Sequence, residues 1–541
     1  MRNIHVRGPD RGSESVGRIV CEVDRFLLIF DAKDHGDRRE HFLNAVQERD
    51  QHFSMEIALD ADGRIIALRG HLLHDLGAYA LQDVNVPYNS ASTLTGPYMV
   101  QAFAMEVTVA LTNKAPVSSV RGAGYPQASF VMERLVDKAA RELGVDRAEL
   151  RRCNLIPTAK MPYTKPLKTR AGATIVYDSG DYPACQAAVV AAAGWDGFAA
   201  RQAAARAEGR AIGIGLAHAM KGTGRGPFES GVVRVSPSGR ISVYTGAVAM
   251  GQGLNTALAQ ICAAELGVAA DDVQVISGDT AMVPVGLGGF ASRQMVTAGS
   301  SVLLAARAVA RKARKLASHV LEVAEEDLEL ADGRLSVAGA PQLGVPLGEL
   351  ARILQGAPGY AFPPGMEPGL QDSCNFRTDA LAYANACHAA EVEVDLETGE
   401  VRILRYVALQ DSGTLVNPLI VDGQVHGGIA HGVGNALFEW MGYDDAAQPL
   451  TANFADYLMP TAPSFPMFET RYQQTPSPLN PLGAKGAGEV GTIPAAAAVI
   501  SAVEDALSWL GVRITRAPVT PALFIELIAK ARNQFGRRAS F

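Results

Sequence analysis

Three hairpin patterns set among helical segments constrain the fold of this chain most strongly. Residues 53–68, 231–245 and 390–407 each alternate apolar and polar side chains on both sides of a polar turn that ends in glycine. Such alternation around a glycine-containing turn predicts two antiparallel strands. The separations between the three hairpins are irregular, which argues against a solenoid of repeats.

Four further segments repeat apolar side chains at helical spacing. They are residues 128–143, 254–266, 299–321 and 494–510. We expect Thr492 to cap the last of these helices, with Pro494 in its first turn and Gly511 after its end. Because strands and helices are mixed without strict strand–helix–strand alternation, the sequence predicts an α+β fold.

Composition narrows the class of protein. The 541 residues are 48% hydrophobic and 19% charged, which is typical of a globular chain long enough for several domains. The net charge is -7 and both signs are mixed along the chain. No basic face for tracking phosphates is predicted, so nucleic acid is not an expected partner.

The spacing of the cysteines and the distribution of apolar residues indicate the cellular compartment. The six cysteines include no C-x-x-C pair, so neither a disulfide framework nor an iron–sulfur or zinc site is expected in this chain. Residues 1–15 have no apolar signal core. The uncharged run 241–264 is interrupted by Gly251, Gln252 and Gly253, so it predicts a strand, a loop and a helix. We therefore expect a cytoplasmic protein without a membrane span.

An Ala-rich, weakly patterned stretch marks the main domain boundary. Residues 180–212 predict a helix and a crossing linker. The sequence therefore divides into a first domain at 1–180, a linker at 181–209 and a second domain at 210–541.

Four glycine-rich segments are candidate ligand-binding loops. They are residues 121–127, 246–253, 286–294 and 423–434. A glycine-rich entry to a helix exposes backbone N–H groups that favour an anion. One such loop is more often only a turn, but four loops with polar side chains favour a large phosphate-bearing cofactor. Those side chains are Gln252, Thr256, Ser292, Arg293 and Gln424.

Glu489 is a candidate general base. It lies in a glycine-rich loop within the stretch 478–492, directly before an Ala-rich helix that should be buried. Desolvation there would raise the pKa of its carboxyl towards neutrality. The dipole of the following helix would instead lower that pKa. Sequence physics alone leaves both interpretations open.

His426 and His431 lie five residues apart in the fourth glycine-rich segment. They lack the helical i,i+4 spacing and a nearby set of carboxylates or thiolates. We expect them to pack or form hydrogen bonds rather than to ligate a metal.

Several motifs in these segments resemble one enzyme family. The motifs are DRREHF (37–42), VRGAG (120–124), RRCNLIP (151–157), MGQG (250–253), GDT (278–280), ASR (291–293), DSG (411–413), NP (417–418) and GAGE (486–489). The chain resembles the molybdenum-cofactor-binding large subunits of the xanthine dehydrogenase, aldehyde oxidase and aerobic carbon monoxide dehydrogenase family, nearest to the form II relatives of the last group.

The resemblance implies two elongated molybdopterin-binding domains of mixed sheets and helices. It implies a molybdenum–molybdopterin cofactor, in bacteria usually the cytosine dinucleotide form, with no direct metal ligand from the protein. By position, Glu489 matches the catalytic base, and Arg121 and Tyr125 match the loop beside the substrate. The residues implied to bind the cofactor are Gly122, Ala123, Gly124, Gly251, Gln252, Gly253, Thr256, Ser292, Arg293, Gln424, Lys485 and Gly486.

The resemblance also implies a reaction and partners. Oxygen derived from water would be added to an aldehyde or a (hetero)aromatic substrate, and electrons would pass to an iron–sulfur small subunit and an FAD-binding medium subunit. The expected assembly is a dimer of such heterotrimers.

Three departures from the family make the first domain incomplete in this interpretation. The family has a long portion before this point, and its Gly-Gly-Gly-Phe-Gly loop falls near residues 9–17, where only scattered glycines stand. Residues 34–37 are also shortened. An inactive, N-terminally truncated relative that acts as a scaffold is therefore the alternative. The segment 118–127 contains no cysteine, so carbon monoxide oxidation through a copper-binding cysteine is not expected.

Overall fold

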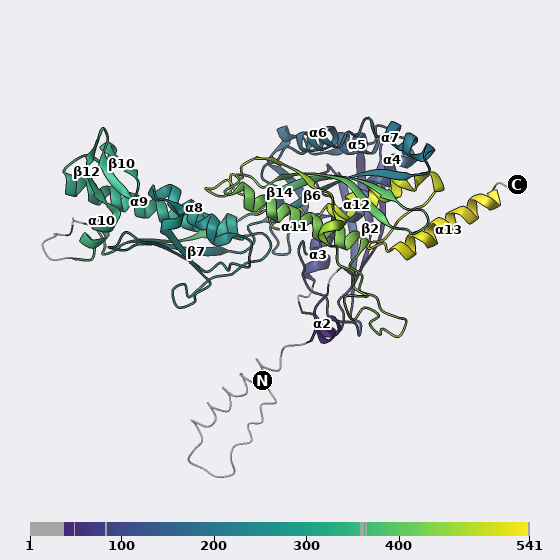
Figure 1. Cartoon of the computed structure of the whole chain (residues 1–541), viewed down its shortest axis with the longest axis horizontal. Coiled ribbons are helices and arrows are strands. Elements are labelled where there is room, and N and C mark those ends of the chain that lie inside the picture. The colour runs from purple at the N-terminus through teal and green to yellow at the C-terminus, as the bar shows by residue number, and fades with distance from the viewer. Residues whose placement is uncertain (1–36, 48, 82–83, 357–361, 363–364, 539–541) are drawn as a thin grey trace, which may run out of the picture.

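The computed structural model describes residues 37–538 except 48, 82–83, 357–361 and 363–364. The expectations for residues 9–17 and 34–36 lie outside the described residues. The molecule is elongated: the strands and helices around β7, α8 and α9 form a lobe at one end, and α13 (Pro521–Arg538) projects from the other (Figure 1).

The first part of the chain folds around a three-stranded sheet in the order β1-β2-β3. The strands are β1 (Gln51–Leu59), β2 (Ile65–Asp75) and β3 (Ala102–Ala110). β1 and β2 form the hairpin predicted at 53–68, and β3 runs parallel to β2. The helices here are α2 (Arg38–Asn44), α3 (Asn85–Thr93), α4 (Tyr125–Leu143) and α5 (Arg147–Asn154), and a short hairpin joins β4 (Tyr163–Lys168) to β5 (Thr174–Tyr177).

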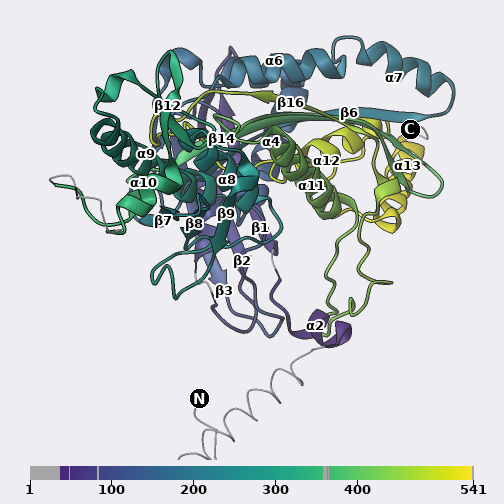
Figure 2. The same cartoon turned by 60° about the vertical axis from the view of Figure 1, so that its left-hand side comes forward.

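A four-stranded sheet forms the centre of the molecule, in the order β16-β15-β14-β6. Its strands are β6 (Ala211–Thr223), β14 (Ala382–Val394), β15 (Val401–Asp411) and β16 (Phe468–Gln473). Helices α11 (Pro418–Leu437) and α12 (Ala495–Ala506) lie along one face, and α6 (Tyr182–Ala193) and α7 (Phe198–Ala207) cover the other (Figure 2). Apolar side chains fill both interfaces, so the sheet is buried between two layers of helices.

Small residues allow α12 to lie directly on β6. A Cβ atom at Gly213 would come within 2.1 Å of the Ala502 carbonyl oxygen, and one at Gly215 within 2.1 Å of the Ala498 carbonyl oxygen. The alanines of α12 leave the same space on the helix side. This contact fixes the start of α12, and hence the loop before it, relative to the sheet.

The distal lobe contains a second four-stranded sheet, in the order β13-β7-β8-β9, and a three-stranded sheet, β10-β11-β12. The strands are β7 (Phe228–Val235), β8 (Ile241–Thr245), β9 (Val273–Ser277), β10 (Leu328–Ala331), β11 (Arg334–Val337), β12 (Ala340–Pro346) and β13 (Leu370–Arg377). Helices α8 (Leu254–Leu266), α9 (Ser300–Leu321) and α10 (Leu347–Ile353) pack on them around one apolar core.

The predicted elements are largely confirmed. All three hairpins form, as β1–β2, β7–β8 and β14–β15. The run 241–264 is strand, loop and helix, as expected. Among the described residues, none of the helices is both long and apolar enough to cross a membrane. The segment 181–209 holds two helices that pack on the central sheet, where one helix and a linker were expected. The domain boundaries stay a prediction.

Two local predictions are wrong. The glycine-rich segment 423–434 is not a loop, because it lies within α11. Its glycines serve a close helix contact: a Cβ at Gly432 would come within 2.4 Å of the Ala495 Cβ. Thr492 does not cap α12, since Pro494 occupies the N-cap position and the Thr492 hydroxyl has no hydrogen-bond partner.

A buried network of charges joins α4, α5 and α12. Arg151 is completely buried and donates to Glu133 Oε2 at 2.7 Å and to Asp137 Oδ1 at 2.8 Å. Asp137 also accepts a hydrogen bond from Ser501 on α12. Burial alone would raise the pKa of Asp137, but the surrounding guanidinium groups, Arg151 foremost, outweigh it and lower that pKa to about 2.

We predict that Arg151→Met lowers the free energy of unfolding by about 3–5 kcal/mol, because it leaves two buried carboxylates without their cation. Arg152→Met is the matched control. The neighbouring Arg152 forms only an exposed ion pair with Glu149, so its loss should change stability by less than about 0.5 kcal/mol. Urea denaturation of both variants measures the difference, and equal effects would contradict the prediction.

Candidate active site

Segments far apart in the sequence converge on one cavity of about 780 Å³. Its wall is formed by α3, the residues before α4, the end of β6, the N-terminus of α8, the turn before α9, the start of α11 and the loop before α12. Three of the four predicted glycine-rich segments thus meet here, together with the start of the fourth.

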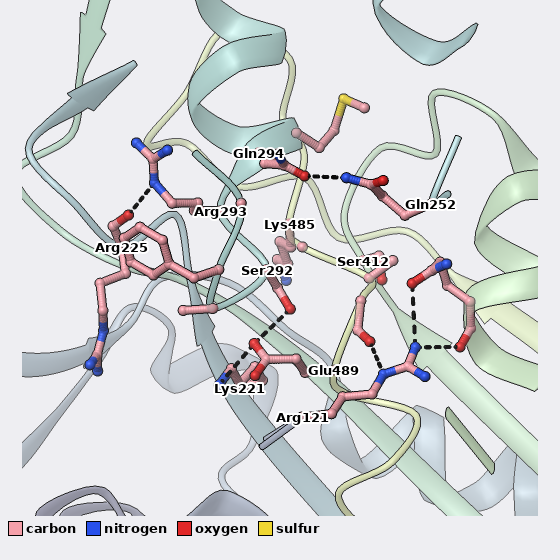
Figure 3. A pocket seen from close by; sticks show the side chains of 18 of the residues that line it. Arg121, Lys221, Arg225, Gln252, Ser292, Arg293, Gln294, Ser412, Lys485 and Glu489 are labelled. Atoms are coloured by element: carbon pink, nitrogen blue, oxygen red, sulfur yellow. Dashed lines mark hydrogen bonds and ion pairs between the residues drawn. The ribbon is translucent and has the colours of Figure 1, made fainter. Parts of the chain in front are cut away.

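Glu489 lies at the point where three of these segments touch (Figure 3). Its Oε1 accepts a hydrogen bond from the Gly122 N–H at 2.9 Å. Its Oε2 accepts one from the Ser292 hydroxyl at 2.8 Å and lies 3.0 Å from Lys221 Nζ. The side chain is 12% exposed, so the carboxylate is held on both oxygens and still borders the cavity.

The charge state of Glu489 follows from these contacts. Burial by itself raises the pKa of the carboxyl, yet the Lys221 ammonium and the hydrogen bonds from Ser292 and Gly122 bring it below its ordinary value. Of the two interpretations that the sequence left open, these contacts favour the lowered pKa. The largest lowering contribution comes from the Lys221 ammonium.

Ser292 reaches Glu489 from an unusual backbone conformation. Ala291 and Ser292 both have positive φ, at 47° and 52°, which non-glycine residues seldom adopt. Gly486 packs against this turn so closely that a Cβ on it would lie 1.9 Å from the Ser292 carbonyl oxygen. The two loops therefore fix each other at the edge of the cavity.

The N-terminus of α8 faces the cavity, and no side chain caps the backbone N–H groups of its first turn. Its N-cap is Gly253, with a φ of 77° and no side-chain cap. The Gln252 amide donates to Gln294 Oε1 at 2.6 Å, and both side chains line the cavity (Figure 3). A Cβ on Gly251 would meet nothing within 4 Å, so open space remains in front of this helix end. An anion fits such a terminus.

The charge of the cavity favours an anionic ligand. Among the described residues that line it, Glu489 is the one carboxylate. The basic residues of the lining are Arg121, Arg170, Lys221, Arg225, Arg293 and Lys485.

The structure brings most of the predicted site residues to this cavity. Those that line it are Arg121, Ala123, Gln252, Gly253, Ser292, Arg293, Gln424, Lys485, Gly486 and Glu489. The others, Gly122, Gly124, Tyr125, Gly251 and Thr256, are not part of the lining. Gly122 acts through its N–H on Glu489, and Tyr125 is buried beneath Lys221, with Nζ 4.2 Å from the ring centroid.

Three basic side chains that were predicted to contact the cofactor or the substrate bind mainly to other parts of the protein. Arg293 is completely buried and pairs with Glu229 at 2.5 Å. The Lys485 ammonium donates to Thr475 Oγ1 at 2.9 Å and lies 3.5 Å from Asp411. Arg121 donates to the Gly488 carbonyl oxygen at 2.6 Å and to the Gln424 carbonyl oxygen at 3.1 Å. These side chains brace the loops of the site.

Sequence reasoning missed several lining residues from α3, the end of β6 and the segment after β6. Asn85, Asn89 and Arg225 line the cavity, and so does Lys221. Lys221 carried a signal, because it is a single cation near the end of the apolar run 211–223. The amides of Asn85 and Asn89 follow no motif in the chain.

The two histidines lie on α11. His426 Nε2 lies 3.5 Å from Asp422 Oδ2, one helical turn away, and its ring contacts Phe468 edge to face. Burial, with the nearby Arg49 and Arg121, lowers the pKa of His431 to about 4. The His426 ring is thus engaged in contacts within the protein, and the His431 ring is largely buried.

Comparison with known proteins places this site in a family. Two family models, each described as a molybdopterin cofactor-binding domain, match residues 32–155 and 188–466. The chain is 38% identical to the gamma subunit of the 6-hydroxypseudooxynicotine dehydrogenase complex of Paenarthrobacter nicotinovorans, over 90% of this chain and 61% of that protein. It is 34% identical to the carbon monoxide dehydrogenase large chain of Afipia carboxidovorans, over 94% and 65%.

Solved structures agree. Quinoline 2-oxidoreductase from Pseudomonas putida 86 superposes with a TM-score of 0.84 at 36% identity, over 91% of this chain and 64% of that one. The chain belongs to the family of molybdopterin-binding large subunits of molybdenum hydroxylases. It spans about 61–65% of the length of these curated relatives.

We predict that Gly486→Ala lowers the free energy of unfolding by about 1–3 kcal/mol, because the new methyl group must displace the Ser292 turn. Gly488→Ala is the control: its Cβ would lie 3.4 Å from Ser292 Oγ, an ordinary contact, so stability should hold. Chemical denaturation of the two variants provides the test. A Gly486→Ala protein as stable as the wild type would show that the loops move apart freely.

Proposed function

We propose that this chain is the cofactor-binding subunit of a molybdenum hydroxylase in which Glu489 is the catalytic base. The observation that carries the proposal is the placement of Glu489: an ionised carboxylate, held on both oxygens, at the border of a cavity whose other charged lining residues are all cations. A carboxylate in that state can accept a proton from a reacting group.

The residues present fit a molybdenum–molybdopterin group, which we propose to be the cytosine dinucleotide form. The open space before Gly253 and the free N–H groups of α8 suit its phosphates. The amides of Gln252, Gln294 and Gln424 offer donors and acceptors to its pterin. Arg121 keeps the loops of Gln424 and Gly488 at a fixed separation.

The cofactor and the protein residues would have different roles in the reaction. When bound, the cofactor supplies a two-electron oxidation in which oxygen from water is added to the substrate. Glu489 takes up the proton released at the start of that reaction. Ser292 and Gly122 hold its oxygens in place during the transfer, and the buried setting limits access of bulk water.

The proposed substrate is a small aldehyde or a (hetero)aromatic compound. Support comes from relatives named for nicotine and quinoline oxidation. The amides of Asn85 and Asn89 and the guanidinium of Arg225 line the cavity on the side of the first part of the chain. They offer hydrogen bonds to a ring nitrogen or a carbonyl oxygen.

We predict that Glu489→Gln lowers the hydroxylation rate per molybdenum by at least about 10²-fold, in the range of ~10²–10⁴ typical of a general base. Glutamine keeps the size of the side chain. Its amide oxygen can accept the bond from Gly122, and its NH2 group can donate to the Ser292 hydroxyl. Molybdenum content should therefore stay unchanged. Both quantities are measured on the same preparation. Full activity per molybdenum would remove Glu489 from the mechanism, whereas lost molybdenum with an unchanged rate per molybdenum would assign it a structural role.

We further propose that electrons leave through an iron–sulfur small subunit and an FAD-binding medium subunit in the cytoplasm, in a dimer of heterotrimers. The chain itself has no C-x-x-C motif. We expect the isolated chain to contain no iron and to turn over only after both partners are added. Metal analysis and a dye-reduction assay test this. Iron in the isolated chain together with substrate-dependent dye reduction would contradict it.

A further inference from the structure

Lys221 is a cation in a fully buried strand. All thirteen residues of β6 are buried, and the Lys221 side chain is only 3% exposed. Burying an ammonium group is costly unless charges and dipoles compensate it. Its Nζ lies 3.0 Å from Glu489 Oε2 and 4.2 Å above the Tyr125 ring centroid, and it donates to the Gly122 carbonyl oxygen at 3.4 Å. These contacts hold it beneath the carboxylate (Figure 3).

The other charged groups around Glu489 are directed elsewhere. Arg121, before α4, donates to the Gly488 and Gln424 carbonyl oxygens. Arg225, after β6, donates to Asn89 Oδ1 at 3.4 Å. Lys485, in the loop of Glu489 itself, is directed to Asp411, and Arg293, beside Ser292, to Glu229. Among the described residues, Lys221 is the one cation that forms an ion pair with Glu489.

The contacts leave Glu489 free to act. A carboxylate can accept about four hydrogen bonds. Oε2 contacts both Ser292 and Lys221, whereas Oε1 accepts a single hydrogen bond, from Gly122. Oε1 therefore keeps capacity for a proton from a molecule in the cavity, while Lys221 and Ser292 hold Oε2.

We propose that Lys221 is a positioning residue for the base: its ion pair with Oε2 keeps Glu489 ionised in a buried site and leaves Oε1 as the oxygen that takes the proton. The role in the reaction rests on the proposed function, whereas the ion pair itself does not. Lys221 thereby sets the lower end of the pH range in which the base works.

The acidic limb of the pH–rate profile tests the role in the reaction. Without the cation, burial dominates and disfavours the ionised carboxylate. In Lys221→Met the acidic limb of kcat should therefore move to higher pH by about one pH unit or more, the size expected when a close opposite charge is lost. Arg170→Met is the control. Arg170 also lines the cavity but forms no ion pair with Glu489, so the acidic limb of this variant should stay at the wild-type pH. An unmoved limb in Lys221→Met overturns the proposal.

A second measurement needs neither molybdenum nor activity. The folded-state pKa of Glu489 lies below its ordinary value, so the pair stabilises the fold at neutral pH and this contribution is lost as the pH falls. The Tm deficit of Lys221→Met should therefore be large at neutral pH and shrink towards acidic pH. In the Glu489→Gln background, Lys221→Met should produce a smaller deficit that does not depend on pH.

The two measurements separate the possible failures. Replacing both charges removes the unpaired carboxylate, so the double variant should unfold at a higher temperature than Lys221→Met at neutral pH. If the Tm losses of Lys221→Met and Glu489→Gln simply add in the double variant, or if the loss in Lys221→Met does not vary with pH, the ion pair itself is overturned. If the Tm values of the single and double variants follow the expected pH dependence but the protein shows no hydroxylation activity, the proposed function alone is refuted. The ion pair between Lys221 and Glu489 would then still stand.

Discussion

The positions of the loops depend on the buried charges between α4 and α12. Each helix begins directly after a loop of the site: α4 after Gly122, and α12 after Glu489. Along the two helices, Asp137 accepts from Ser501, and Arg134 pairs with Glu504. Because these groups are buried and paired, a shift of one helix along the other would leave charges without partners. Because α4 and α12 are held in this way, the hydrogen bond from Gly122 to Glu489, which joins the loops before the two helices, is also held in place.

The site joins parts of the chain that share no local motif. The proposed base, Glu489, comes from the loop before α12, its cation from the end of a central strand, and its hydroxyl donor from a strained turn in the distal lobe. The remaining space is bordered by an uncapped helix end on one side and by amides of α3 on the other. The fold thus separates the helix end that we propose to bind phosphates from the amides that we propose to contact the substrate.

Alternation and helical spacing predicted the hairpins and most helices, because these signals are local. α11 was missed because glycine usually breaks helices, and here it permits close contact with the start of α12. Glu489 was found through its glycine-rich setting, but the sign of its pKa shift was left open. That sign depends on Lys221, 268 positions away in the sequence, and no local pattern reports such a pairing. Arg293 and Lys485 were identified as cavity residues, but their partners, Glu229 and Asp411, were not.

The tight packing of Gly486 on Ser292 has a consequence for anyone redesigning this protein. Gly486 leaves no room for an added side chain beside the proposed base, so libraries that vary this position will return destabilised chains rather than new activities. Asn85 and Asn89 lie across the cavity on α3, outside the hydrogen bonds that hold Glu489. Substitutions there can change the shape of the cavity while the contacts of the proposed base stay intact.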